Sequence, residues 1–210
     1  MLFFIFTYKY IFTNLKEPMT NSDTIVLIGD SILNNNMYVP VGKSVADNIK
    51  LIHGNNIIIG AKDNATIDTC YYQLNMNNIN NSENYFVFIS IGGNDILNNL
   101  LDDSKKNKTI NKNKLENLKK KYIKLVKFIE DKYPKAKIHL LNLYFPSDEK
   151  YKKYEKSIIE WNKMIENVCL ENKYSLLRID NLLKNPSDFT NGIEPSVIGS
   201  EKIAKLIVNS

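Results

Sequence analysis

The chain has little arginine, cysteine or histidine, and each shortage excludes a class of protein. Of its 28 Lys and Arg residues, only Arg178 is an arginine. Because arginine forks make many of the contacts to base edges and phosphates, we expect no specific nucleic-acid partner. The two cysteines, Cys70 and Cys169, and the two histidines, His53 and His139, are too few and too scattered for a disulfide scaffold or a zinc site. We therefore expect no bound metal.

Long apolar runs are also lacking. Residues 1–12 are apolar and aromatic, but a lysine interrupts them and the run is too short to span a bilayer. Residues 1–18 have three open interpretations: a dispensable leader preceding a natural start at Met19, a signal or anchor, or a packed extension. Membrane association is expected only through residues 1–12. We treat residues 1–20 as an apolar N-terminal extension and residues 21–210 as one domain.

The composition that is present fits a globular protein. The 210 residues are 43% hydrophobic, which is enough for one domain with a sizeable core. The net charge is +5, and the lysine-rich segment 105–132 carries an apolar stripe, so its lysines are read as a solvated helix face. Frequent Lys, Asn and Ile residues are typical of an AT-rich genome. We expect a monomer.

Apolar segments and helical patterns alternate along the chain. Strands are expected at residues 24–28, 56–60, 85–91, 137–144 and 176–179. Helices are expected at residues 44–51, within 64–78, at 112–132, from a cap at Ser147 onward, and from Ser196 to the end. This alternation predicts an α/β fold with a five-stranded parallel sheet between two helical layers, a flavodoxin-like three-layer sandwich.

Polar segments follow three of these strands. They are Gly29-Asp30-Ser31, Asp63-Asn64-Ala65-Thr66 and Gly92-Gly93-Asn94-Asp95. Since the carboxyl ends of parallel strands meet at one edge of the sheet, these segments should lie together. The Ser31 hydroxyl is a candidate nucleophile, and the Asn94 amide and the Asn64 backbone N–H are candidate oxyanion donors. Two structural alternatives stay open: Ser31 as a helix N-cap and Asn94 as a loop-capping amide.

The three segments resemble the sequence blocks of SGNH (GDSL-type) hydrolases, and the resemblance runs from Thr24 to Ser210. The first resembles the nucleophile block, and the third matches the asparagine block letter for letter. The second resembles the glycine block, with an asparagine where the glycine stands. The resemblance implies a cofactor-free esterase that cleaves a small-molecule carboxylic ester through an acyl-serine. The site residues that it implies for oxyanion and substrate binding are Asn64, Asn94, Gly93, Asp30 and Asn191.

The last block departs from the family pattern, which has Asp-x-x-His and then Pro before the final helix. Here Glu194 stands at the histidine position and Asn191 at the aspartate position. Because both histidines are predicted to lie away from the site, Glu194 is the candidate base, provided that burial raises its pKa. Asp188 is expected to orient Glu194 or share a proton with it, whereas a hydrogen bond from Asn191 would lower its basicity. The alternative is that Glu194 is only a helix-start acid.

Three functions therefore stay open. The first is ester hydrolysis, and the second is a catalytically impaired relative that binds an acyl or glycan ligand. The third is a membrane-surface protein that uses the apolar leader and the lysines. Tyr38-Val39-Pro40 is expected to form one wall of the cleft. Because a glycan on the sequon Asn64-Ala65-Thr66 would block the site, we expect a cytoplasmic protein, or a secreted or anchored one if residues 1–18 are a signal.

Overall fold

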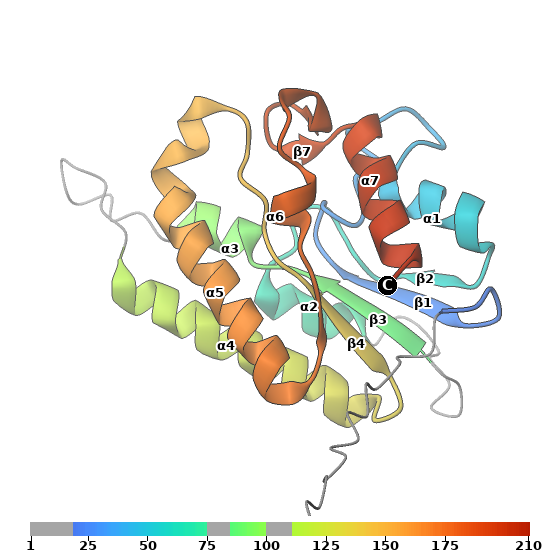
Figure 1. The fold of residues 1–210 in the computed structure, drawn as a ribbon. Helices are drawn as coiled ribbons and strands as arrows, with labels where there is room; N and C mark the ends of the chain where they lie inside the picture. The colour runs from blue at the N-terminus through green and yellow to red at the C-terminus, as the bar shows by residue number, and fades with distance from the viewer. Residues whose placement is uncertain (1–18, 75–84, 100–110) are drawn as a thin grey trace, which may run out of the picture.

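The computed structural model describes residues 19–74, 85–99 and 111–210 (Figure 1). The interpretations of residues 1–18 fall outside these ranges and stay predictions. Within the described ranges, no helix combines the length and the hydrophobicity needed to cross a membrane.

Five parallel strands form the central sheet, in the order β2-β1-β3-β4-β5. Their bounds are β1 Thr24–Gly29, β2 Ile57–Ile59, β3 Tyr85–Ser90, β4 Lys137–Leu141 and β5 Ser175–Leu177. The two central strands pair over their full length, from Thr24 opposite Tyr85 to Gly29 opposite Ser90. All six residues of β3 are buried, because helices cover both faces of a parallel sheet.

Helices flank the sheet on both faces (Figure 1). They are α1 Val45–His53, α2 Ile67–Gln73, α3 Gly93–Asn99, α4 Lys112–Lys132, α5 Glu155–Asn172, α6 Ile179–Leu182 and α7 Val197–Val208. Helices α1 and α7 pack together on one face, while α2, α4 and α5 lie on the other. The buried residues of α4 form the stripe that the sequence indicates, and most of its lysines are exposed. The predicted fold class is therefore confirmed.

The structure differs from the expected elements at several places. Strand β4 ends at Leu141 and not at residue 144, and the unexpected helix α6 begins at Ile179, where the fifth strand was expected to end. Ser147, the expected cap, does not cap a helix. Asp148 instead caps the 3₁₀ helix η1, Glu149–Tyr154, because its side chain accepts the Lys150 N–H at 3.0 Å. Helix α5 follows η1 directly. Helix α3 was not expected. A short antiparallel hairpin, β6 Phe189–Thr190 with β7 Glu194–Pro195, also precedes α7 after the 3₁₀ turn η2, Pro186–Asp188.

Candidate active site

The turn that carries Ser31 is fixed by the end of β1. Gly29 has φ +144°, and any side chain there would overlap the Ser90 carbonyl of β3. The Gln73 side chain holds Gly29 from both sides: its Nε2 donates to the Gly29 oxygen at 2.8 Å, and its Oε1 accepts the Gly29 N–H at 2.9 Å. Beyond Ser31, the Leu33 N–H donates back to the backbone carbonyl oxygen of Asp30. Ser31 therefore lies in a tight turn and does not cap a helix.

Asn94 reaches the same edge from the end of β3. Gly92 has φ +114°, and a Cβ at this position would overlap the Trp161 indole, so only glycine allows α3 to start here. Asn94 is the second residue of α3, and its Nδ2 donates to the Ala65 carbonyl oxygen at 3.0 Å. This bond ties the amide to the loop between β2 and α2.

Glu194 enters the site from β7, and its neighbours in the chain are held on both sides. The Tyr144 hydroxyl donates to the Ile193 oxygen at 2.7 Å, and Asn35 Nδ2 donates to the Pro195 oxygen at 2.8 Å. Asn35 is fully buried and also donates to Ser200 Oγ at 2.7 Å. The position of Glu194 is thus set by groups from distant parts of the chain.

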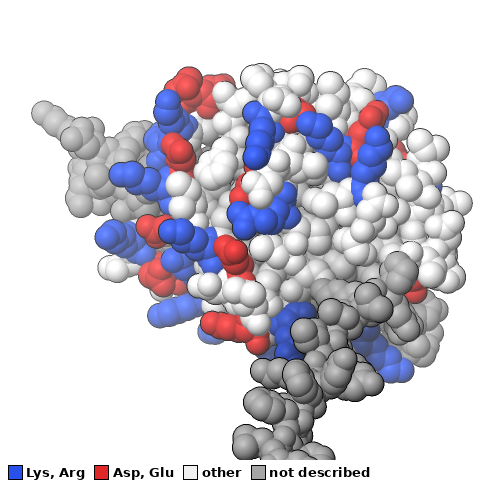
Figure 2. Space-filling model, viewed as in Figure 1, with Lys and Arg blue, Asp and Glu red and all other residues white. Residues whose placement is uncertain are grey.

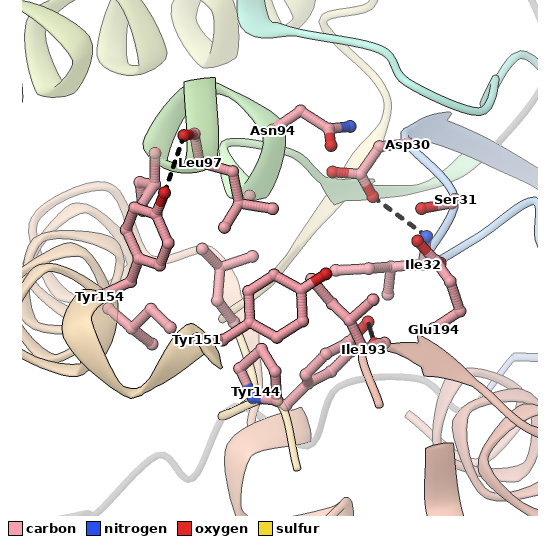
Figure 3. A pocket seen from close by; sticks show the side chains of 15 residues that line it. Asp30, Ser31, Ile32, Asn94, Leu97, Tyr144, Tyr151, Tyr154, Ile193 and Glu194 are labelled. Atoms are coloured by element: carbon pink, nitrogen blue, oxygen red, sulfur yellow. Dashed lines mark hydrogen bonds between the residues drawn. The ribbon is translucent and has the colours of Figure 1, made fainter. Parts of the chain in front are cut away.

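One pocket brings the chemistry-bearing residues together (Figure 3). Ser31, Asp30, Gly93, Asn94 and Glu194 all line it. The rest of its lining is apolar or aromatic: Ile32, Ile96, Leu97, Leu143, Tyr144, Pro146, Tyr151, Tyr154, Ile158 and Ile193. No lysine or arginine is among the described residues that line it. The pocket therefore joins a hydroxyl, an amide and two carboxyls to an apolar wall.

Burial raises the pKa of Glu194 above its ordinary value of 4.5, a hydrogen bond with Ser31 lowers it, and the nearby Asp63 carboxylate raises it. Its Oε2 is buried without a hydrogen-bond partner in the described part of the chain. Since Ser196 caps α7 by accepting the Gly199 N–H at 3.2 Å, Glu194 is not needed as a helix-start acid. Its carboxyl instead interacts with the candidate nucleophile, with its basicity raised.

Asp30 is the second carboxyl of the pocket and is only 2% exposed. One of its oxygens accepts the Ile32 N–H at 3.1 Å. Burial raises the pKa of Asp30 to about 8; the Ile32 N–H lowers it, and the nearby carboxyls of Glu194 and Asp95 raise it.

No protein-family model matches the chain, and no curated protein matches it. Solved structures do. A lipolytic protein of the G-D-S-L family from Veillonella parvula aligns with a TM-score of 0.67 at 16% identity, over 88% of this chain and 96% of the other. The chain has the SGNH hydrolase fold. A lipase from Streptomyces rimosus has a TM-score of 0.67 at 14% identity, over 90% of this chain and 99% of its own. An acetyl xylan esterase from Geobacillus stearothermophilus has a TM-score of 0.66 at 14% identity, over 91% of this chain and 97% of its own.

Asp188 does not take the supporting role that we expected in this SGNH fold. Its Oδ2 accepts the N–H groups of Lys184 and Asn185, both at 3.0 Å, and its Oδ1 pairs with Lys202 Nζ at 2.7 Å. Burial alone would raise the pKa of Asp188, but Lys202 and the two N–H donors outweigh it, so the pKa is low. With both oxygens engaged, this carboxyl anchors α7 and does not act on Glu194.

Two asparagines of the predicted set lie outside the pocket lining. Asn64 adopts a left-handed turn, φ 57°, as expected of a residue in the glycine position, but its N–H donates to Asp63 Oδ1 at 2.9 Å. Asn191 is exposed at the turn of the β6–β7 hairpin, with φ 53°. The predicted wall at residues 38–40 is also absent from the lining: the Tyr38 hydroxyl donates to Asp63 at 3.0 Å instead.

Neither histidine reaches the site. His139 is buried in β4 with its ring 4.6 Å from that of Phe88, and His53 Nε2 lies 2.9 Å from the Asp23 oxygen at the start of β1. Across the described ranges, no group of three or more His, Cys, Asp or Glu side chains could hold a metal ion.

The sequence reasoning missed the residues that position Glu194. Asn35 belongs to the asparagine run 34–36, in which nothing local distinguishes the asparagine that becomes buried. Tyr144 and the aromatic lining residues Tyr151 and Tyr154 did carry a signal, since they are apolar side chains beside a predicted strand end and on a predicted helix face.

Proposed function

We propose that this protein is a serine esterase that hydrolyses a carboxylic ester through an acyl-serine. The observation that carries the proposal is that the Ser31 hydroxyl and the half-buried Glu194 side chain, whose pKa is raised, line the same largely apolar pocket. The solved structures that share the fold are named lipolytic protein, lipase and acetyl xylan esterase, which favours ester hydrolysis as the class of reaction.

In the proposed mechanism, Ser31 Oγ attacks the ester carbonyl while Glu194 accepts the hydroxyl proton. Glu194 then returns that proton to the departing alcohol. Water then attacks the acyl-serine with Glu194 again as base, the bond between the acyl carbon and Ser31 Oγ breaks, Glu194 returns the proton to Ser31 Oγ, and the carboxylic acid leaves. The Ser31 N–H and the Asn94 amide are the proposed oxyanion donors. The Asn64 N–H would first have to leave Asp63 in order to serve as a third.

An esterase assay tests the nucleophile. We expect the purified protein to hydrolyse p-nitrophenyl acetate, and Ser31→Ala to lower kcat/KM by at least about 1,000-fold, because no other group replaces the attacking oxygen. The matched control is Ser147→Ala, the same change at an exposed serine near the pocket, which should leave the rate unchanged. Equal rates for wild type and Ser31→Ala would exclude Ser31 as nucleophile. Absence of hydrolysis across a panel of acyl esters would favour the ligand-binding alternative.

A further inference from the structure

The proposed mechanism leaves one pocket group unused, the Asp30 carboxyl. In the view of Figure 3 it lies between the side chains of Ser31 and Asn94. Its Oδ1 accepts the Ile32 N–H. Its Oδ2 lies 3.7 Å from the point where a Cβ on Gly93 would stand. One oxygen of a buried carboxyl is thus directed at the pocket floor beside the nucleophile.

The groups around Asp30 favour its protonated form. Glu194 of β7 and Asp95 of α3 face it as carboxyls, and both raise its pKa. The Cys70 thiol of α2 and the Tyr144 hydroxyl also interact with it, and the pKa of each lies above its ordinary value, so both stay neutral near neutral pH. No lysine or arginine among the described lining residues compensates a negative charge. Asp30, with a pKa of about 8, therefore holds its proton at neutral pH.

We propose that Asp30 is a catalytic hydrogen-bond donor that presents the proton on its pocket-facing oxygen to the substrate oxygen that becomes negative when Ser31 attacks. This inference rests on the proposed esterase function. The proton stays on Asp30 throughout, and the hydrogen bond strengthens as charge develops, so no bond to Asp30 forms or breaks. A carboxylic acid kept neutral by an apolar site can donate in this way. It would supply the third donor while the Asn64 N–H is held by Asp63.

The test is the pH profile of kcat/KM with p-nitrophenyl acetate between about pH 6 and about pH 9.5, for wild type, Asp30→Asn and Asp95→Asn. Wild type should lose about ten-fold per pH unit above pH 8, as Asp30 loses its proton. Asp30→Asn keeps an acceptor for the Ile32 N–H and presents an N–H that does not titrate. It should retain activity within about ten-fold of wild type at neutral pH and show no alkaline fall before pH 9.

Asp95→Asn is the matched control, because Asp95 is also a buried carboxyl but accepts the Ile67 N–H at 3.0 Å and does not line the pocket. It should keep an alkaline fall, which begins at a lower pH than in wild type because the Asp95 charge no longer raises the pKa of Asp30. An alkaline fall in Asp30→Asn like that of wild type would overturn the proposal, and so would a folded Asp30→Asn protein inactive at every pH.

A second measurement covers an Asp30→Asn variant that fails to fold. Infrared spectroscopy of wild type and Asp95→Asn should show a protonated-carboxyl band at about pH 7.5 that disappears above about pH 9. Absence of this band at the lower pH would overturn the proposal. Labelling of Ser31 by a fluorophosphonate separates the two hypotheses: if wild-type Ser31 is not labelled, the esterase function fails, whereas a labelled Ser31 with an unaltered Asp30→Asn profile rejects only the role of Asp30.

Discussion

In the proposed mechanism, Glu194 takes the role that an imidazole has in the usual SGNH block. A free imidazole has a pKa of about 6.5, and a free glutamate lies near 4.3, where it is a weak base for a hydroxyl. Burial and the Asp63 charge both raise the pKa of Glu194, which reduces the difference from the pKa of an imidazole. A glutamate at an exposed position would remain a weak base, so the proposed role of Glu194 depends on its burial and its neighbours as well as on its carboxyl group.

The raised pKa predicts where activity appears on the pH axis. Since the base acts when deprotonated, kcat/KM should rise as pH passes upward through the pKa of Glu194, at a pH above 4.5. In Glu194→His this rise should move toward about pH 6.5. The measurement is kcat/KM between about pH 4 and about pH 7.5 for both proteins. An identical acid limb in the two would show that residue 194 is not the titrating base.

Asp188 gives a prediction of the opposite kind. Asp188→Asn should lower the free energy of unfolding by about 1 to 3 kcal/mol. The substitution removes the buried negative charge that pairs with Lys202 and replaces one carboxylate oxygen by an amide nitrogen, which cannot accept a hydrogen bond. The acid limb of kcat/KM should not move. Asp148→Asn, which alters a more exposed pair with Lys150, is the control and should lower the free energy of unfolding less than Asp188→Asn does. Urea denaturation measures both, and a shifted acid limb in Asp188→Asn would restore the expectation that Asp188 acts on Glu194.

At the scale of elements, sequence reasoning succeeded where a segment determines its own structure. The apolar runs of β1 and β3 and the stripe of α4 were predicted closely because hydrophobic periodicity is local. Helix α3 was missed because two glycines are poor helix formers, and its start depends on the packing of Trp161 over Gly92. The β6–β7 hairpin was missed for the same kind of reason, since the bond from Asn35 to Pro195 spans 160 residues.

The candidate site divides in the same way. Ser31, Asn94 and Glu194 were located by motif and spacing, and the structure places all three in one pocket. The sequence did not predict which of two carboxyls lies in the pocket with Glu194. Asp188 stands three residues before Asn191, but its carboxyl is paired with Lys202, whereas Asp30 lines the pocket. Side-chain direction and burial decide between them, and neither can be read from spacing.

The hairpin that carries Glu194 predicts an effect of Tyr144. Tyr144→Phe removes the hydroxyl that holds the Ile193 carbonyl oxygen, so Glu194 should be less well positioned and kcat should fall about ten-fold, with about 1 kcal/mol lost in stability. Tyr122→Phe is the matched control, because the Tyr122 hydroxyl is buried without a partner in the described residues. Steady-state kinetics on both variants test this, and equal kcat values would show that the Tyr144 bond does not position the base.

At the scale of the whole molecule, the surface and the site have different electrostatic character. Figure 2 shows lysines interspersed with acidic residues over the visible face. Several are paired, such as Lys119 with Glu116 and Lys127 with Glu130. The full chain has a net charge of +5, whereas the described pocket lining carries two carboxyls and no basic side chain. Composition therefore says little about what the pocket binds.

The buried Asp30 couples the site to the stability of the fold. The pKa of Asp30 is about 8 in the folded protein, above its ordinary value of 3.8. Its contribution to the free energy of unfolding is therefore fully present below pH 3.8 and is lost as the pH rises toward 8. Between about pH 5 and pH 8, the free energy of unfolding of wild type should therefore fall by up to about 4 kcal/mol relative to that of Asp30→Asn. Urea denaturation of both proteins at several pH values measures this difference. A constant difference would contradict a raised pKa for Asp30.

The rate at which a fluorophosphonate labels Ser31, followed by mass spectrometry in wild type and Glu194→Gln, tests most directly whether this hydroxyl is activated by its acidic neighbour. Glutamine keeps the shape of the side chain but cannot accept the proton. Wild type should be labelled at Ser31 alone, and the variant at least about 100-fold more slowly. Equal labelling rates, or a label on another residue, would contradict the account.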